Sequence, residues 1–309
     1  MEKVAYFFID DVIWVMRDIA RERPASLFDN GFMKMLKKAH DEWGLTVQLN
    51  LFYRTDFFYG NEEFTLSDMP DIYKPEFEAA SDWLKMAFHA KQEFPDYPYV
   101  NATYEDVKDN YELVVGEIKR FAGEKSVSVT LCPHWLPVSK AGCHALYDCG
   151  VKFVSPSTGD TKEFDGDDDC LPYGHSFRLR QNRQPETKLC IRAGKNTRIA
   201  NSICGYNHVS TEIKNSYFGK NTSHLDEETG LRFRQLGGGP TLNLHSLEEI
   251  DEALDKLNDG REFIGCATHE QYYYPHYYAY QPDYAEKIYL LARKVTEFGY
   301  RWITAEEFK

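Results

Sequence analysis

The sequence predicts an α/β fold built on parallel strands, and three observations support this prediction. Short apolar runs of strand length alternate with longer segments of helical periodicity, which is the pattern of βα units around a parallel sheet. The first run, Val4 to Ile9, is apolar throughout, as expected of a strand that is buried on both faces. With 309 residues and an apolar fraction of 42%, the chain can bury a large core.

Seven runs have the length and composition of strands, each with polar or glycine-containing sequence nearby. In chain order they are Val4 to Ile9, Leu45 to Phe52, the shorter Lys85 to His89, Val127 to Cys132, Val151 to Val154, Glu262 to Thr268, and Tyr300 to Ile303. The last of them closes the pattern at the end of the sequence.

Three helices can be placed between these strands from the spacing of their apolar residues. The first follows Thr103, which is placed to cap it, and ends at Gly123. The second begins at Ser246, and Glu249 three residues later completes a capping box. The third runs from Tyr284 to Phe298, before a terminating glycine.

Residues 156–245 break this alternation, and we interpret them as a partly β insertion within one barrel-like domain that spans residues 1–309. The acidic patch from Asp165 to Asp169 lacks the ligand spacing of a calcium loop, so we interpret it as a solvated turn. The glycines from Gly237 to Gly239 lack the spacing of a phosphate-binding fingerprint and predict a loop.

The formal charge of −13, from 36 basic and 49 acidic residues, argues against a nucleic-acid partner. No apolar run approaches the length of a membrane helix, and no secretory leader is evident at the N-terminus, so we expect no membrane association. The seven cysteines are odd in number and form no Cys-x-x-Cys pair, which favours reduced thiols and a cytoplasmic location. The sequence leaves the oligomeric state open.

Two adjacent carboxylates, Asp10 and Asp11, end the first predicted strand, where the loops of a parallel barrel form active sites. Neighbouring side chains of a regular strand point to opposite faces, so both reach one site only where the chain begins to turn. The alternative interpretation is a helix N-cap with a solvated neighbour.

Two further clusters contain residues of the kinds that bind metals, and each follows a predicted strand. His89 and Glu93 are four residues apart and share a face if the segment forms a helical turn. Imidazole and carboxylate groups are ordinary ligands of zinc and similar divalent metals. After the next strand come His134, whose alternative role is that of a buried, hydrogen-bonded residue, and Trp135, an aromatic side chain suited to contact a ligand.

The fourth cluster begins with His269 and continues into the tyrosine-rich segment from Tyr272 to Tyr280. A histidine at the end of a strand can act as a general acid or base near neutral pH. The tyrosines either form a loop that covers the barrel or a platform for sugar rings. Because all four clusters share one topological position, we expect them to form one site.

The order of these clusters resembles that of the polysaccharide deacetylase family, whose catalytic unit is the NodB homology domain. The resemblance covers most of the chain outside the insertion, although no motif is intact, and it marks the chain as a divergent member. The family has a second histidine where this chain has Glu93. The similar segments are Phe8-Ile9-Asp10-Asp11, His89-x-x-x-Glu93, Cys132-Pro133-His134-Trp135, Ala267-Thr268-His269 and Gly299-Tyr300.

The resemblance implies a distorted (β/α) barrel of about seven parallel strands. It implies Asp10 as general base, His269 as general acid, and Asp11 and His89 as metal ligands. The third ligand is expected to be Glu93, with His134 as the alternative. The expected metal is a divalent ion, zinc, and its identity depends on which of the two residues binds it.

The remaining expectations concern the substrate. The arginine that supports the base in the family is missing from the loop after Pro133, and Arg54 is the expected substitute. Trp135 and Tyr272 are expected to contact the substrate, a small carbohydrate or amide. The implied reaction removes an N-acetyl group from a carbohydrate by attack of metal-bound water; the alternatives are hydrolysis of a ureide or a catalytically inactive sugar-binding protein.

Overall fold

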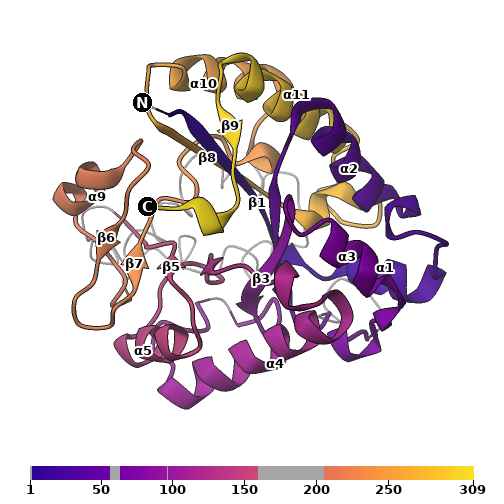
Figure 1. Cartoon of the computed structure of the whole chain (residues 1–309), viewed down its shortest axis with the longest axis horizontal. Helices are drawn as coiled ribbons and strands as arrows, with labels where there is room; N and C mark the ends of the chain where they lie inside the picture. The colour runs from indigo at the N-terminus through magenta and orange to yellow at the C-terminus, as the bar shows by residue number, and fades with distance from the viewer. Residues whose placement is uncertain (1, 56–62, 96, 159–204) are drawn as a thin grey trace.

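A computed structural model gives the fold of the protein and describes residues 2–55, 63–95, 97–158 and 205–309 (Figure 1). Its central sheet has five strands, with β1 at the middle of the order β3-β2-β1-β8 and β9 also paired with β1. All pairs in this sheet are parallel. The strands are β1 (Val4–Val12), β2 (Val47–Phe52), β3 (Leu84–Ala90), β8 (Phe263–His269) and β9 (Arg301–Trp302).

A second sheet of four short strands has the order β4-β5-β7-β6, in which only the β6–β7 pair is antiparallel. Two single bridges join the chain around this sheet to the central sheet. Val127, shortly before β4, pairs with Met86 of β3, and Thr241, after β7, pairs with Ala267 of β8. The strands are β4 (Thr130–Leu131), β5 (Phe153–Val154), β6 (His224–Leu225) and β7 (Arg232–Phe233).

The α/β class with parallel strands is therefore confirmed, whereas the predicted closed barrel is not seen in the described ranges. The strands expected at 127–132 and 151–154 shorten to two residues each, because regular pairing extends over only two positions there. The expected insertion includes residues 159–204 with the Asp165 to Asp169 patch, and these lie outside the described residues.

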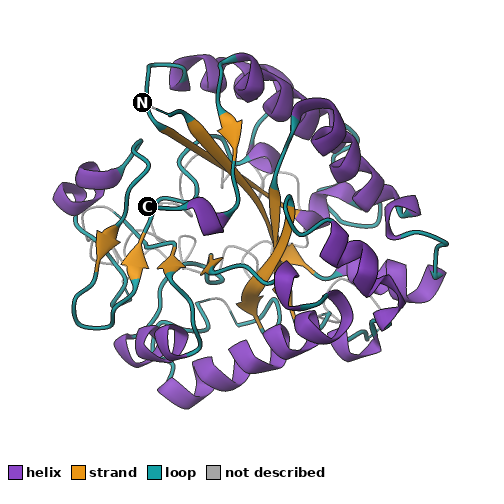
Figure 2. Cartoon of the chain, viewed as in Figure 1, coloured by secondary structure: helices purple, strands orange, loops and turns teal. Residues whose placement is uncertain are grey.

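The helices lie around the outside of the strands (Figure 2). The predicted caps are present: Thr103 and Asp106 form a capping box at α4, as do Ser246 and Glu249 at α10. None of the helices in the described ranges combines the length and apolar character that a bilayer-crossing segment needs. The helices are α1 (Trp14–Glu22), α2 (Gly31–Trp43), α3 (Lys74–Ala79), α4 (Tyr104–Ala122), α5 (Lys140–Asp148), α9 (Thr211–Tyr217), α10 (Leu247–Leu257) and α11 (Tyr284–Glu297).

Helix α1 has no side-chain cap of its own, and Glu270, directly after β8, takes that place. Its buried carboxylate accepts hydrogen bonds from the backbone N–H groups of Ile13, Trp14 and Val15 at 2.8, 2.8 and 2.6 Å. Burial raises the pKa of Glu270 to about 7, and the three N–H donors only partly offset this effect. The contact ties the end of β8 to the helix that follows β1.

This raised pKa predicts a pH-dependent contribution to stability. The folded protein holds the Glu270 proton more tightly than the unfolded chain, so the contribution is full below the unfolded pKa and is lost as the pH rises through 7. In Glu270→Gln, which cannot ionise, this loss is absent. From pH 5 to pH 8, the free energy of unfolding of the wild type should fall relative to the variant by about 3 kcal/mol. Urea titrations at several pH values measure it, and parallel pH profiles would contradict it.

Replacing two glycines of this fold by alanine is expected to change stability in opposite directions, because their surroundings differ. The segment after Leu236 crosses β8 so closely that a Cβ on Gly265 would lie 1.8 Å from the carbonyl oxygen of Leu236. Gly116, inside α4, has open space around it. We expect Gly265→Ala to lower the free energy of unfolding by about 3 kcal/mol or more, and Gly116→Ala to raise it by about 0.5–1 kcal/mol. Denaturant midpoints test both, and equal effects of the two changes would show that the close approach is wrong.

Candidate functional site

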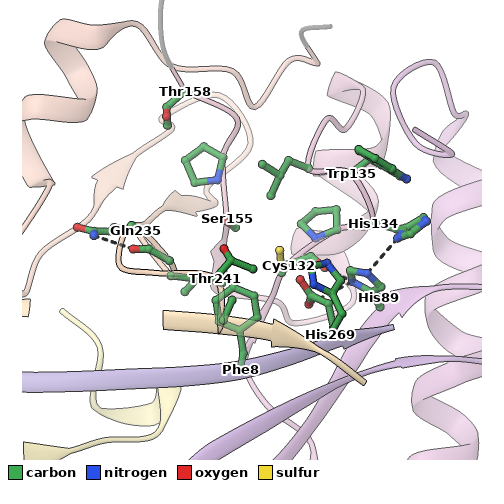
Figure 3. A pocket seen from close by; sticks show the side chains of 18 of the residues that line it. Phe8, His89, Cys132, His134, Trp135, Ser155, Thr158, Gln235, Thr241 and His269 are labelled. Atoms are coloured by element: carbon green, nitrogen blue, oxygen red, sulfur yellow. Dashed lines mark hydrogen bonds and ion pairs between the residues drawn. The ribbon is translucent and has the colours of Figure 1, made fainter. Parts of the chain in front are cut away.

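A cavity of about 510 Å³ opens at the C-terminal edge of the central sheet (Figure 3). It is lined by the polar residues that end three of the sheet's strands: Asp10 and Asp11 on β1, His89 on β3, and His269 on β8. His134 joins them from the loop after β4. The four clusters that the sequence placed at strand ends therefore meet at one cavity, as the shared edge of parallel strands requires.

The two adjacent carboxylates reach this cavity together because β1 turns at Asp11. Asp11 has a φ of 62°, in the left-handed region that few residues other than glycine adopt. At the same place, between Ile9 and Val12, the pairing of β1 with β2 shifts its register. The expected turn is thus confirmed, and the N-cap alternative is wrong because Ile13 occupies the N-cap of α1.

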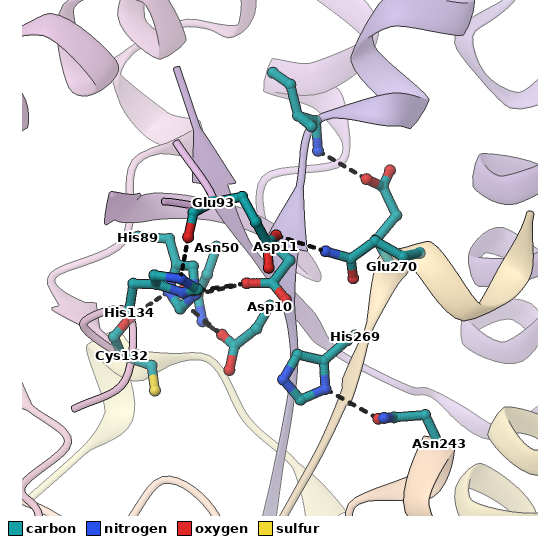
Figure 4. A network of polar contacts seen from close by, with 12 residues as sticks. Asp10, Asp11, Asn50, His89, Glu93, Cys132, His134, Asn243, His269 and Glu270 are labelled. Carbon is teal, nitrogen blue, oxygen red and sulfur yellow. Dashed lines mark hydrogen bonds and ion pairs between the residues drawn. The ribbon is translucent and has the colours of Figure 1, made fainter. Parts of the chain in front are cut away.

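Asp11, His89 and His134 form a group that is able to hold a metal ion. Asp11 Oδ1 lies 3.1 Å from His89 Nε2 and 3.3 Å from His134 Nδ1, and the two nitrogens are 3.1 Å apart (Figure 4). Atoms bound at about 2.1 Å to a tetrahedral metal lie about 3.4 Å from one another. The spacing of these three buried atoms is close to that geometry.

Hydrogen bonds fix which nitrogen of each imidazole faces the group. His89 Nδ1 lies 2.6 Å from the carbonyl oxygen of Cys132, and His134 Nε2 lies 2.9 Å from that of Glu93. Because a carbonyl only accepts, both of these nitrogens carry hydrogen. The other two nitrogens then present lone pairs to each other and to Asp11, whose Oδ2 is also buried without a hydrogen-bond partner in the described ranges. Only a proton or a cation among them relieves this repulsion, and the donor set fits a divalent metal.

Glu93, the first candidate for third ligand, lies outside this group. The expected helical turn from His89 is absent, because β3 continues to Ala90 and pairs there with Phe52. The Glu93 carboxylate accepts a hydrogen bond from Gln271 Nε2 at 3.1 Å, and its backbone carbonyl accepts one from His134 Nε2 at 2.9 Å. In the structure, the alternative candidate His134 takes the place beside Asp11 and His89.

The two neighbouring carboxyl groups are in different electrostatic environments. For Asp11, burial opposes ionisation, but the His134 and His89 imidazoles beside Oδ1 outweigh it, because either one stabilises the carboxylate when it is protonated. They hold the pKa of Asp11 well below the usual range. For Asp10, burial dominates and raises the pKa, with the nearby His89 and His269 offsetting part of the effect. Environments that push the pKa values of paired carboxyl groups apart are typical of groups with separate roles.

Asp10 is held by a chain of amides that the sequence analysis missed. Asn50 donates from Nδ2 to Asp10 Oδ1 at 2.6 Å, and Gln48 donates to Asn50 Oδ1 at 2.7 Å. Gln48 and Asn50 are two residues apart on the fully buried strand β2, so their side chains share one face. Two amides in an otherwise apolar run indicate a buried hydrogen-bonding partner, and this signal could have identified them from the sequence. Arg54, the expected substitute for the family's arginine, instead donates to Gln92 Oε1 at 2.5 Å and does not line the cavity.

His269 stands beside Asp10 in the register of β8 against β1, so both side chains point to the same face of the sheet. Its Nδ1 lies 3.0 Å from Asn243 Oδ1, which also accepts from the Thr268 hydroxyl at 3.2 Å. The amide oxygen therefore accepts the Nδ1 hydrogen, which fixes the orientation of the ring. Asn243 was not singled out, because it lies 26 residues before His269 on a short helical turn.

The aromatic candidates divide between cavity and core. Trp135 lines the cavity from a loop in which Trp135 and Leu136 both have positive φ, 63° and 75°. Tyr272 is buried and does not line the cavity; the centroid of its ring lies 5.1 Å from that of Tyr277. Further along the tyrosine run, rings pack against Trp14 rather than forming an open platform.

The four cysteines within the described ranges (132, 143, 149 and 266) are all free. This agrees with the expectation of reduced thiols for these positions. Cys170, Cys190 and Cys204 lie outside the described residues.

Comparison with known proteins finds similar folds at low sequence identity. No family model matches the chain, and no curated protein matches it. The 4-alpha-glucanotransferase from Thermococcus litoralis is similar with a TM-score of 0.50 and 11% identity, over 99% of this chain and 40% of that one. A putative polysaccharide deacetylase from Mycobacterium smegmatis follows with a TM-score of 0.43 and 10% identity, over 98% and 86%.

A CE4 family pseudoenzyme from Bacillus anthracis is also similar, with a TM-score of 0.42 and 8% identity, over 97% of this chain and 63% of that one. This chain thus spans less than two thirds of the glucanotransferase and of the pseudoenzyme. At these identities the similarity concerns the fold alone.

Proposed function

We propose that the protein is a metal-dependent hydrolase of an amide C–N bond, and that it removes the N-acetyl group of a small carbohydrate. One observation carries the proposal: three buried acceptor atoms of Asp11, His89 and His134 lie within 3.3 Å of one another beside Asp10 and His269. Two imidazoles and one carboxylate are a ligand set of catalytic zinc, so zinc is the metal we expect.

Asp11, His89 and His134 would hold a divalent metal, which would supply a Lewis acid for the amide carbonyl and would make a water molecule more acidic. Asp10, fixed by Asn50, accepts the proton that a water molecule loses as it attacks the acyl carbon. His269, whose Nδ1–H is held by Asn243, acts as an imidazolium that donates its Nε2 proton to the leaving amine and becomes neutral. The C–N bond then breaks to give the free amine and acetate.

The walls of the cavity favour a sugar over a small ureide. Trp135, Tyr217 and Phe218 line it with aromatic side chains, and the volume of about 510 Å³ is large for a ureide. Aromatic side chains offer flat apolar surface with a polar rim, which suits the faces and hydroxyls of a pyranose ring.

The test is to measure the metal content of the purified protein and then its release of amines. N-acetylated amino sugars and ureides are supplied in parallel to the metal-loaded protein. Free amine from the sugars, lost when a chelator removes the metal, supports the proposal. Turnover of ureides alone would assign a different substrate, and sugar binding without turnover would assign a binding protein.

A further inference from the structure

The charges that line the cavity are unevenly distributed. Asp10 and Asp11 lie at the strand ends, and Lys214 of α9 is the only lysine or arginine in the described lining. No other carboxylate belongs to that lining. A divalent cation at the metal group would balance these two carboxylates, and among the described lining residues the charge of Lys214 would then have no counter-charge. A chain of net charge −13 thus keeps one local positive charge in this cavity.

Lys214 is half-buried, and within the described ranges its ammonium has neither an ion pair nor a hydrogen bond. The ammonium lies over the Phe218 ring, with Nζ 4.8 Å from the ring centroid. By contrast, Lys220 at the end of the same segment donates to the carbonyl oxygen of Ser216 at 2.9 Å. An ammonium that is partly removed from water and contacts only a ring gains most from an anion brought into the cavity.

A hydroxyl lies at the same end of the cavity. Thr158 lines the cavity and pairs with Val209, one residue before Ser210, the N-cap of α9. Lys214 and Thr158 therefore line the cavity from neighbouring segments, one with a cation and the other with a hydroxyl donor. The reacting groups Asp10 and His269 belong to the ends of β1 and β8.

We propose that the substrate carries an anionic group, a carboxylate or a phosphate, which binds Lys214 while the acetamide lies at Asp10 and His269. The inference rests on the proposed function for the position of the acetamide, and on Lys214 alone for the anion. It narrows the substrate class from acetylated amino sugars in general to those that bear an acid.

Calorimetry with three matched sugars tests the anion separately from turnover. N-acetylglucosamine, its 6-phosphate and its 6-carboxylate (the uronic acid) differ only at one carbon. We expect at least one of the two anionic sugars to bind the metal-loaded protein at least about tenfold more tightly than the neutral one. The anionic sugar that shows this preference identifies the acid. The preference should fall in 0.5 M KCl, because salt screens the ion pair.

Variants locate the effect. Lys214→Met should reduce the preference to about onefold, Lys214→Arg should retain it, and the matched control Lys220→Met should leave it unchanged. Equal binding of the three sugars, no binding of either anionic sugar, or a preference that survives Lys214→Met would overturn the inference. Tighter binding of an anionic sugar without amine release would overturn the proposed hydrolysis but support the anion site. Amine release from neutral sugars, with equal binding of all three sugars, would overturn the anion site but support the hydrolysis.

Discussion

Replacing His89 by alanine is expected to remove the bound metal from the protein. His89 Nε2 is one of three atoms that converge on the proposed ion, and among the described residues the group contains only these three ligand atoms. Loss of one ligand from a three-ligand site should lower the metal content from about one to below about 0.1 per chain after dialysis. Elemental analysis of wild type and variant measures this. His144→Ala, on α5 and outside the cavity lining, is the control.

The same measurement decides between the two candidates for third ligand. His134→Ala should lose the metal as His89→Ala does, whereas Glu93→Gln should keep it, because the Glu93 carboxylate contacts Gln271 and not the group. Metal loss in Glu93→Gln with retention in His134→Ala would reverse this assignment. A metal-free wild type with an intact fold would refute the metal site altogether.

Replacing Asp10 by asparagine should abolish turnover while the metal stays bound. The amide preserves the shape of the side chain next to Asn50 but cannot accept a proton from water. A positioned general base contributes about 10²–10⁴-fold, so kcat for amine release should fall by about that factor. Steady-state rates and metal analysis on the same preparation separate the two effects.

Asp148→Asn serves as the matched control, because this carboxylate is on the surface and accepts from the Tyr104 hydroxyl. It should leave the rate unchanged. Wild-type rates in Asp10→Asn would mean that another group accepts the proton and that the assignment of the base is wrong. Loss of metal in Asp10→Asn would mean that Asp10 is itself a ligand.

Local features of the sequence were enough to predict much of this fold. The apolar runs from Val4 and Leu45 became β1 and β2, and the Thr103 and Ser246 caps begin α4 and α10 as expected. These predictions succeed because burial of a strand on both faces and satisfaction of helix-end N–H groups involve residues close in the chain. Closure of a barrel is not determined locally in this way, because it depends on pairing between strands that are far apart in the sequence.

The convergence of Asp10, Asp11, His89, His134 and His269 also follows from sequence, since the ends of parallel strands share one edge. Which atoms meet there is decided by tertiary structure. The turn at Asp11, the carbonyls that orient the two imidazoles and the extended end of β3 together select His134 over Glu93. Each of these depends on backbone dihedrals and hydrogen bonds between segments far apart in the chain, and residue spacing does not encode them.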